Sequence, residues 1–169
     1  MTGRTLLRAA GILAALALPF SAAATTITIV NANDPGVGFN DPAPRDPVGG
    51  NAGTTLGEQR LNVFKYAAAF WAQRIDSPVE IRVRASFFAA SEEKPCSATS
   101  AVLGSAGTAY INWDFAGAPR PDTYYPSALA NKLAGEDLNP YVDADDSGED
   151  ISARFTTSLD DGSCAFPRK

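Results

Sequence analysis

Apolar and polar residues alternate along several short segments of the chain, and this alternation predicts β-strands. The clearest segments are Thr26–Val30, Val79–Ala85 and Ile151–Thr156. They are rich in β-branched or aromatic residues and lie next to residues typical of turns. A further strand is predicted over Thr108–Trp113. In the second segment the alternating polar residues are charged, which indicates a half-buried strand with one charged face.

A helical pattern follows the irregular stretch Asn31–Pro47. It begins at a capping box, in which Thr55 precedes Glu58 by three residues. Apolar residues then recur at helical spacing. They are Leu61, Phe64, Ala68, Trp71 and Ile75. At about 1.5 Å per residue, the pattern predicts a helix of roughly 30 Å, long enough to cover one face of a sheet. A shorter helix is predicted to begin at Pro126 or Ser127 and to end at Gly135.

Together these elements predict an α+β fold with a small mixed sheet, one long covering helix and a short second helix. Residues 25–169 are expected to form a single α+β domain, because a chain of this length builds one hydrophobic core. The apolar face of the strand Val79–Ala85 is expected to lie under the long helix. The polar loop that carries Cys96 is expected to connect two strands.

Residues 1–24 have the pattern of a secretory signal peptide. Arg4 and Arg8 precede the apolar run Ala9–Leu18, and small residues follow at Ala22–Ala24. The run is shorter than the roughly 20 residues that a membrane anchor needs. We therefore expect cleavage near Ala24 and a secreted or periplasmic product with no membrane attachment.

The charge of the chain argues against nucleic acid and against anionic membranes as partners. The sequence has 14 basic and 19 acidic residues, a net charge of −5. Removal of the signal peptide leaves 12 basic residues against the same 19 acidic ones, and the net charge becomes −7. An acidic surface repels polyanions. A peptide or protein partner stays open.

Cys96 and Cys164 are the only cysteines. An even number of cysteines in an oxidising compartment predicts a disulfide. The alternative is one metal ligand from each, but a zinc site would need further cysteine or histidine ligands. The disulfide is the stronger expectation.

The chain contains no histidine. Histidine is the usual general base near neutral pH and a common ligand of catalytic zinc, so most hydrolytic mechanisms lose their central group. No catalytic residue is assigned from the residues themselves, and no cofactor is expected apart from the calcium considered next.

An acidic segment near the C-terminus partly matches a calcium-binding loop. Asp143, Asp145 and Ser147 occupy the first, third and fifth positions, and a glycine follows at the sixth. Asp150 is a further candidate ligand. The twelfth position holds Arg154 in place of the glutamate that completes such a loop. A solvated acidic turn and a calcium site therefore both stay open.

The loop from Phe115 to Pro126 contains adjacent aromatic residues, Tyr124 and Tyr125. They could stack on a sugar or on a peptide and so form a contact loop. Alternatively, they pack beneath the loop, as aromatic residues beside a proline often do.

Seven segments spread over nearly the whole chain after the signal peptide resemble one family in their order and spacing. They are Ile29–Pro42, Pro47–Asn51, Gly53–Leu61, Val102–Gly107, Asp114–Pro119, Tyr125–Asn131 and Asp150–Phe155. The sequence is similar to the N-terminal region of secreted bacterial proteins that contain a protease-associated (PA) domain and whose central part resembles a zincin metallopeptidase.

The resemblance implies a fold similar to the upper, N-terminal subdomain of a zincin. In that family a downstream helix bearing His-Glu-x-x-His would hold zinc and activate water. No such helix exists in this sequence, so the resemblance implies zinc only in a missing downstream part and no catalysis by these residues. Whether the chain is part of an enzyme is therefore uncertain.

Two functional expectations follow. In the first, the chain is the non-catalytic N-terminal part of a secreted zinc-metallopeptidase-like protein, cut short at Lys169. The sheet of a zincin is packed by two helices, so the absence of the second would leave apolar sheet surface exposed. In the second, the chain is a self-contained exported binding or structural module, which calcium could stabilise.

Overall fold

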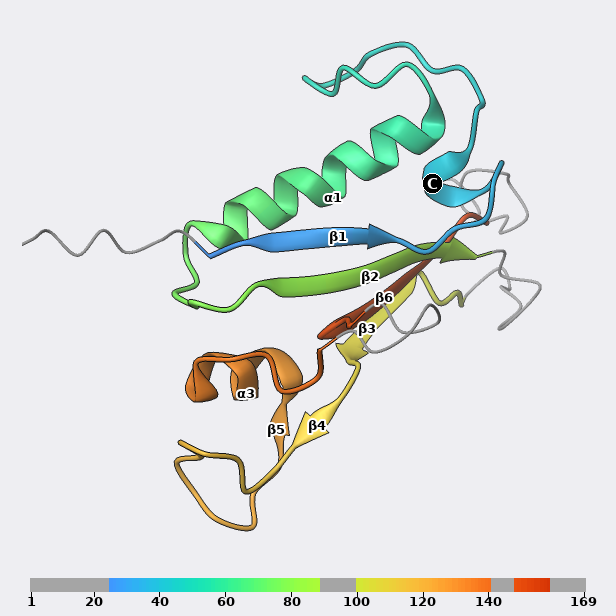
Figure 1. The fold of residues 1–169 in the computed structure, drawn as a ribbon. Helices are drawn as coiled ribbons and strands as arrows, with labels where there is room; N and C mark the ends of the chain where they lie inside the picture. The colour runs from blue at the N-terminus through green and yellow to red at the C-terminus, as the bar shows by residue number, and fades with distance from the viewer. Residues whose placement is uncertain (1–24, 89–99, 141–147, 159–169) are drawn as a thin grey trace, which may run out of the picture.

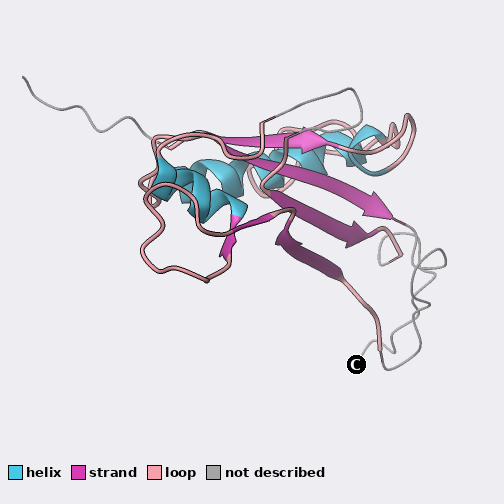
Figure 2. Cartoon of the chain, turned by 60° about the horizontal axis from the view of Figure 1, so that its bottom comes forward, coloured by secondary structure: helices cyan, strands magenta, loops and turns pink. Residues whose placement is uncertain are grey.

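A computed structural model describes residues 25–88, 100–140 and 148–158 of the chain. Its main sheet has four strands in the order β1–β2–β6–β3 (Figure 1). The strands are β1 (Ile27–Asn31), β2 (Ile81–Phe88), β6 (Ile151–Thr156) and β3 (Gly104–Thr108). The first three are parallel, and β3 runs antiparallel to β6 at the edge. Figure 2 shows the strands side by side with a pronounced twist.

The long helix α1 (Leu56–Ala72) packs on β1 and on the short 3-10 helix η1 (Gly38–Asn40). The capping box is confirmed. The Thr55 hydroxyl accepts a hydrogen bond from the Glu58 N–H (3.1 Å), and the Glu58 carboxylate accepts one from the Thr55 N–H (3.2 Å). These hydrogen bonds satisfy backbone donors that the first turn of a helix leaves without partners.

Beyond the edge strand the chain forms a smaller unit. β4 (Ile111–Asn112) pairs with β5 (Tyr125–Pro126), which leads directly into the helix α3 (Ser127–Ala134). As predicted, α3 ends at Gly135, whose φ of 77° is the left-handed conformation that glycine adopts without strain. Within the described residues, neither helix has both the length and the apolar character needed to cross a bilayer.

The predicted α+β class, with a mixed sheet, one longer helix and a short second helix, is confirmed. Two predicted strands have other bounds in the structure. In place of Val79–Ala85, β2 begins at Ile81 and continues to Phe88. The segment Thr108–Trp113 is divided between the end of β3 and the separate strand β4. The part of β3 before Thr108 consists of glycine, serine and alanine, which have no strand preference of their own. Pairing with β6 makes this segment a strand.

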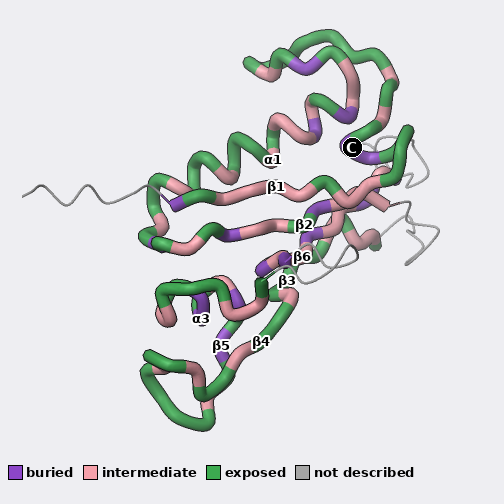
Figure 3. The backbone as a smooth tube through the Cα atoms, in the orientation of Figure 1, coloured by how far each residue is buried: buried purple, intermediate pink, exposed green. Residues whose placement is uncertain are grey.

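Four phenylalanines form the centre of the core. They are Phe39 of η1, Phe64 of α1, Phe87 of β2 and Phe155 of β6. The ring of Phe64 lies 4.9 Å from that of Phe39 and 5.2 Å from that of Phe155, both nearly perpendicular. Edge-to-face contacts of this kind add to the stabilisation from burial. Figure 3 places many of the buried residues where η1, the start of α1 and the central strands meet.

The segment Ile29–Pro42 has an architectural role. The Asn33 side chain accepts hydrogen bonds from the N–H groups of Phe39 and Phe87 (both 3.1 Å) and donates one to the Phe87 carbonyl (2.8 Å). Gly38 has a φ of 57°, and a Cβ there would overlap Asn33. The polar residues of this segment thus hold η1 against the sheet.

Candidate functional site

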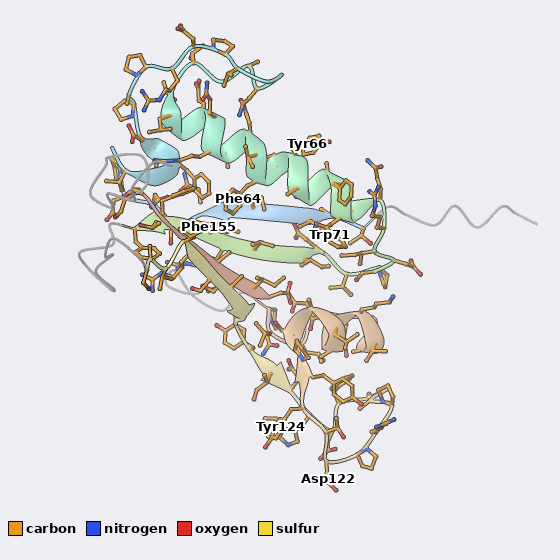
Figure 4. The ribbon with its side chains drawn as sticks, turned by 180° about the vertical axis from the view of Figure 1, so that it is seen from behind. Phe64, Tyr66, Trp71, Asp122, Tyr124 and Phe155 are labelled. Carbon is orange, nitrogen blue, oxygen red and sulfur yellow. The ribbon has the colours of Figure 1, made fainter. Side chains whose placement is uncertain are left out.

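An apolar groove lies between α1 and the sheet. Its volume is about 330 Å³. The residues that line it are apolar, and they come from α1, from the segment directly after α1, and from β1, β2 and β6. They are Ile27, Ile29, Phe64, Ala67, Ala68, Trp71, Ile75, Ile81, Val83 and Ile151. In Figure 4, Phe64 and Trp71 extend from α1 toward the sheet, whereas Tyr66 extends away from it.

The groove is not closed by the described residues. Trp71 lies on its wall, and 55% of its surface is exposed. α1 packs mainly on β1, and α3 packs on β4 and β5. The ring of Phe64 in α1 reaches β6 at Phe155, but among the described residues no helix is packed along β3 on the sheet face that α1 shares. Ile151 and Phe155 stay only half-buried there. This groove can accept the apolar face of another helix or strand, but its lining residues offer no group for acid–base chemistry.

A second exposed surface lies on the β4–β5 hairpin. Tyr124 and Trp113 are 67% and 57% exposed, and their rings lie 5.6 Å apart at an angle of 68°. Tyr125 lies on the opposite face and is buried. Its hydroxyl accepts a hydrogen bond from the Arg120 N–H (3.1 Å), and its ring packs against Phe115 at 5.4 Å. Of the two predicted contact residues, only Tyr124 is available to a partner.

Sequence reasoning missed Trp113 as the neighbour of Tyr124. The signal was present, because adjacent residues of a strand point to opposite faces. Tyr124 and Tyr125 therefore could not share one surface if the segment was a strand. Trp113 becomes the cross-strand neighbour only once β4 and β5 pair in the observed register. That register is not visible in the sequence.

Asp150 joins the main sheet to α3. Its carboxylate accepts hydrogen bonds from the Arg82 N–H and from the Asn131 side chain, each 2.9 Å long. Its carbonyl accepts hydrogen bonds from the Ser127 hydroxyl (2.9 Å) and the Ala109 N–H (2.8 Å). Asp150 is almost completely buried, with 3% of its surface exposed.

The surroundings of Asp150 change its proton affinity. Burial raises the pKa of Asp150 above its ordinary value of 3.8, because a buried carboxylate loses its hydration. The hydrogen bond from the Arg82 N–H acts in the opposite direction, and the negative charge of Asp137 raises the pKa further. Both carboxylate oxygens of Asp150 already accept hydrogen bonds, so this side chain has a structural role in the observed fold.

The remaining predicted site residues lie outside the described ranges. This applies to the calcium candidates Asp143, Asp145 and Ser147 and to the two cysteines, Cys96 and Cys164. The calcium site and the disulfide therefore stay predictions. Within the described residues, no group of three or more His, Cys, Asp or Glu side chains could hold a metal ion. Those residues, in a chain without histidine, do not fit a catalytic zinc site.

A larger hollow, about 680 Å³ in volume, lies between α1 and the turn around Gly49–Ala52. Asn62, Val63 and Tyr66 form its helical side. The Asn62 side chain donates a hydrogen bond to Asn51 (2.9 Å), which positions the turn beside the helix. The described lining contains no ionisable group other than the Tyr66 phenol, so the hollow supplies no set of catalytic groups.

Comparisons with protein-family models, curated proteins and solved structures found no match to this chain.

Proposed function

We propose that this chain is the non-catalytic N-terminal part of a secreted zinc-metallopeptidase-like protein. Its residues form a scaffold, and the apolar groove between α1 and the sheet receives a helix from the downstream part of that protein. The zinc ligands and the general base belong to that downstream part. The proposal is based on the resemblance of the seven segments and assigns no catalytic residue to this chain.

The observation that carries the proposal is the open apolar groove. A sheet packed by two helices would leave this kind of surface if only the first helix were in place. The half-exposed Trp71 and the half-buried Ile151 both line the groove that a second helix would cover. The order of strand, long helix and further strands also agrees with the layout that the resemblance implies.

A self-contained binding module is the second candidate function. The exposed pair Trp113 and Tyr124 favours it, because neither ring takes part in the core. The two candidates differ in what the chain needs for stability. A complete module would unfold cooperatively without any added segment. A scaffold with an open groove would bind a dye for apolar surfaces and would gain stability when the groove is covered.

The proposal is tested first by reading the DNA beyond the codon for Lys169, where we expect a stretch encoding His-Glu-x-x-His. Trp71 then reports on the groove in a Trp113→Phe variant, because the chain has only these two tryptophans. In a longer chain carrying the downstream segment, quenching of Trp71 by acrylamide is expected to fall.

The matched control is Trp71→Phe, in which Trp113 is the only reporter. Quenching of Trp113 is expected to be the same in the short and the long chain, since no hairpin residue lines the groove and Tyr124 lies far from Trp71 in Figure 4. Absence of a His-Glu-x-x-His stretch in every reading frame, or an unchanged quenching of Trp71, would contradict the proposal.

A further inference from the structure

The β4–β5 hairpin presents a small aromatic surface that the scaffold proposal does not use. Trp113 directly follows β4 and Tyr124 directly precedes β5, so the alternation of strand residues places them on the same face as Ile111 and Pro126. Ile111, Trp113 and Tyr124 are all more than half exposed. Large aromatic side chains grouped in this way on a surface are typical of recognition sites.

The loop behind this surface is held in shape. Asp114 and Asp122 both have a φ of 49°, a left-handed conformation that is uncommon outside glycine. The Asp122 N–H donates a hydrogen bond to the Asp114 carboxylate (2.9 Å), which closes the loop between them. Tyr125 and Phe115 fill the opposite face. The rings of Trp113 and Tyr124 are therefore positioned in advance, which lowers the entropy lost on binding.

The geometry of the two rings and the charges of the loop indicate which chemical group a partner would present. The two rings pack edge to face at 68°, so they do not form the flat surface on which a sugar stacks best. An exposed ring face that remains open suits a compact cation, which is attracted to aromatic faces. The carboxylates of Asp114 and Asp122 come from the same loop, where Arg120 is the one opposing charge, and the whole chain has a net charge of −5. Lysine and arginine side chains match both features.

We propose that Trp113 and Tyr124 form a binding site for a lysine or arginine side chain of a basic segment in a partner protein. The cation contacts an exposed ring face of this edge-to-face pair, and Asp114 and Asp122 attract it electrostatically. This inference does not depend on the scaffold proposal, since the hairpin residues take no part in the groove. It would hold equally for a self-contained module.

Calorimetric titration of the purified chain with a short lysine–glycine peptide tests the proposal. We expect binding that weakens as salt is added, because the exposed charges are then screened. The same peptide with every lysine acetylated is expected not to bind. Trp113→Ala and Tyr124→Ala are each expected to weaken binding about fivefold, the size of a single cation–π contact.

Tyr66→Ala is the matched control, because Tyr66 is 76% exposed on α1 and lies far from the hairpin in Figure 4. It should leave peptide binding unchanged. Trp113→Phe, which keeps a ring face, should retain more binding than Trp113→Ala, and circular dichroism should show each variant folded. No binding of the lysine peptide, equal binding of the acetylated one, or binding of a neutral oligosaccharide through the same residues would overturn the proposal.

Discussion

Replacement of Asp150 by alanine is expected to lower the free energy of unfolding by about 4 kcal/mol. The change leaves two donors without their acceptor, the Arg82 N–H and one N–H of the Asn131 side-chain amide, whereas that amide keeps its hydrogen bond to Asp137 (3.2 Å). Each buried donor without a partner costs roughly 1–3 kcal/mol. Asn131 cannot turn to compensate, because its carbonyl oxygen accepts a hydrogen bond from the Leu138 N–H (3.0 Å). Urea denaturation of both proteins measures the difference.

The exposed Asp76 gives the control, since Asp76→Ala removes the same side chain from the surface and should change stability by less than about 0.5 kcal/mol. Asp150→Asn keeps the shape and one acceptor, and it should cost less than Asp150→Ala. An Asp150→Ala protein as stable as Asp76→Ala would show that this residue does not join the sheet to α3.

The same residue makes stability depend on pH. Because the pKa of Asp150 is raised above 3.8 in the folded protein, the folded state holds the proton more tightly than the unfolded state. The proton-linked part of its contribution to stability is therefore fully present below pH 3.8 and is lost as the pH rises through the raised pKa. The contribution of Glu58 to stability depends on pH in the opposite direction, since hydrogen bonds from Thr54 and Thr55 lower its pKa below 4.5. Asp150→Asn should remove the pH dependence that comes from Asp150 and leave the pH dependence that comes from Glu58.

Replacement of Phe64 by alanine is expected to lower the free energy of unfolding by about 3 kcal/mol, at the lower end of values for buried phenylalanines because the groove already exposes part of the ring. Phe64 contacts the rings of Phe39, Phe87 and Phe155, so its loss removes the aromatic contacts between α1 and the sheet. The groove should also widen and bind more of a dye for apolar surfaces. Thermal and urea denaturation measure the first effect, and dye fluorescence measures the second.

Tyr66→Ala is a strict control for this experiment. Both substitutions remove an aromatic ring from α1, two positions apart, but Tyr66 points away from the sheet and is 76% exposed. We expect a change of less than about 0.5 kcal/mol for Tyr66→Ala. Equal losses for the two variants would mean that α1 is not packed on the sheet through Phe64.

The helices were the most predictable elements, because their signals are local. The capping box at Thr55 and the spacing of Phe64, Ala68 and Trp71 specify both the start and the buried side of α1. Gly135 likewise marks the end of α3. The part of β3 before Thr108 was not predictable, since its small residues become a strand only by pairing with β6. Such pairing joins residues far apart in the sequence.

The candidate surfaces were only partly predictable for the same reason. The spacing of apolar residues on α1 identified one wall of the groove, but the opposite wall depends on which strands lie side by side. Asp150 belongs to an acidic segment that matches part of a calcium loop. Its use as an acceptor for Arg82 and Asn131 arises from contacts across 68 and 19 residues. No local pattern encodes such contacts.

The central claim is that these residues provide a scaffold and leave the zinc chemistry to another part of the protein. It is tested most directly by measuring peptide hydrolysis by the purified chain, with and without a metal chelator. Our account predicts no chelator-sensitive hydrolysis, with or without added zinc. Hydrolysis that a chelator abolishes and zinc restores would contradict it.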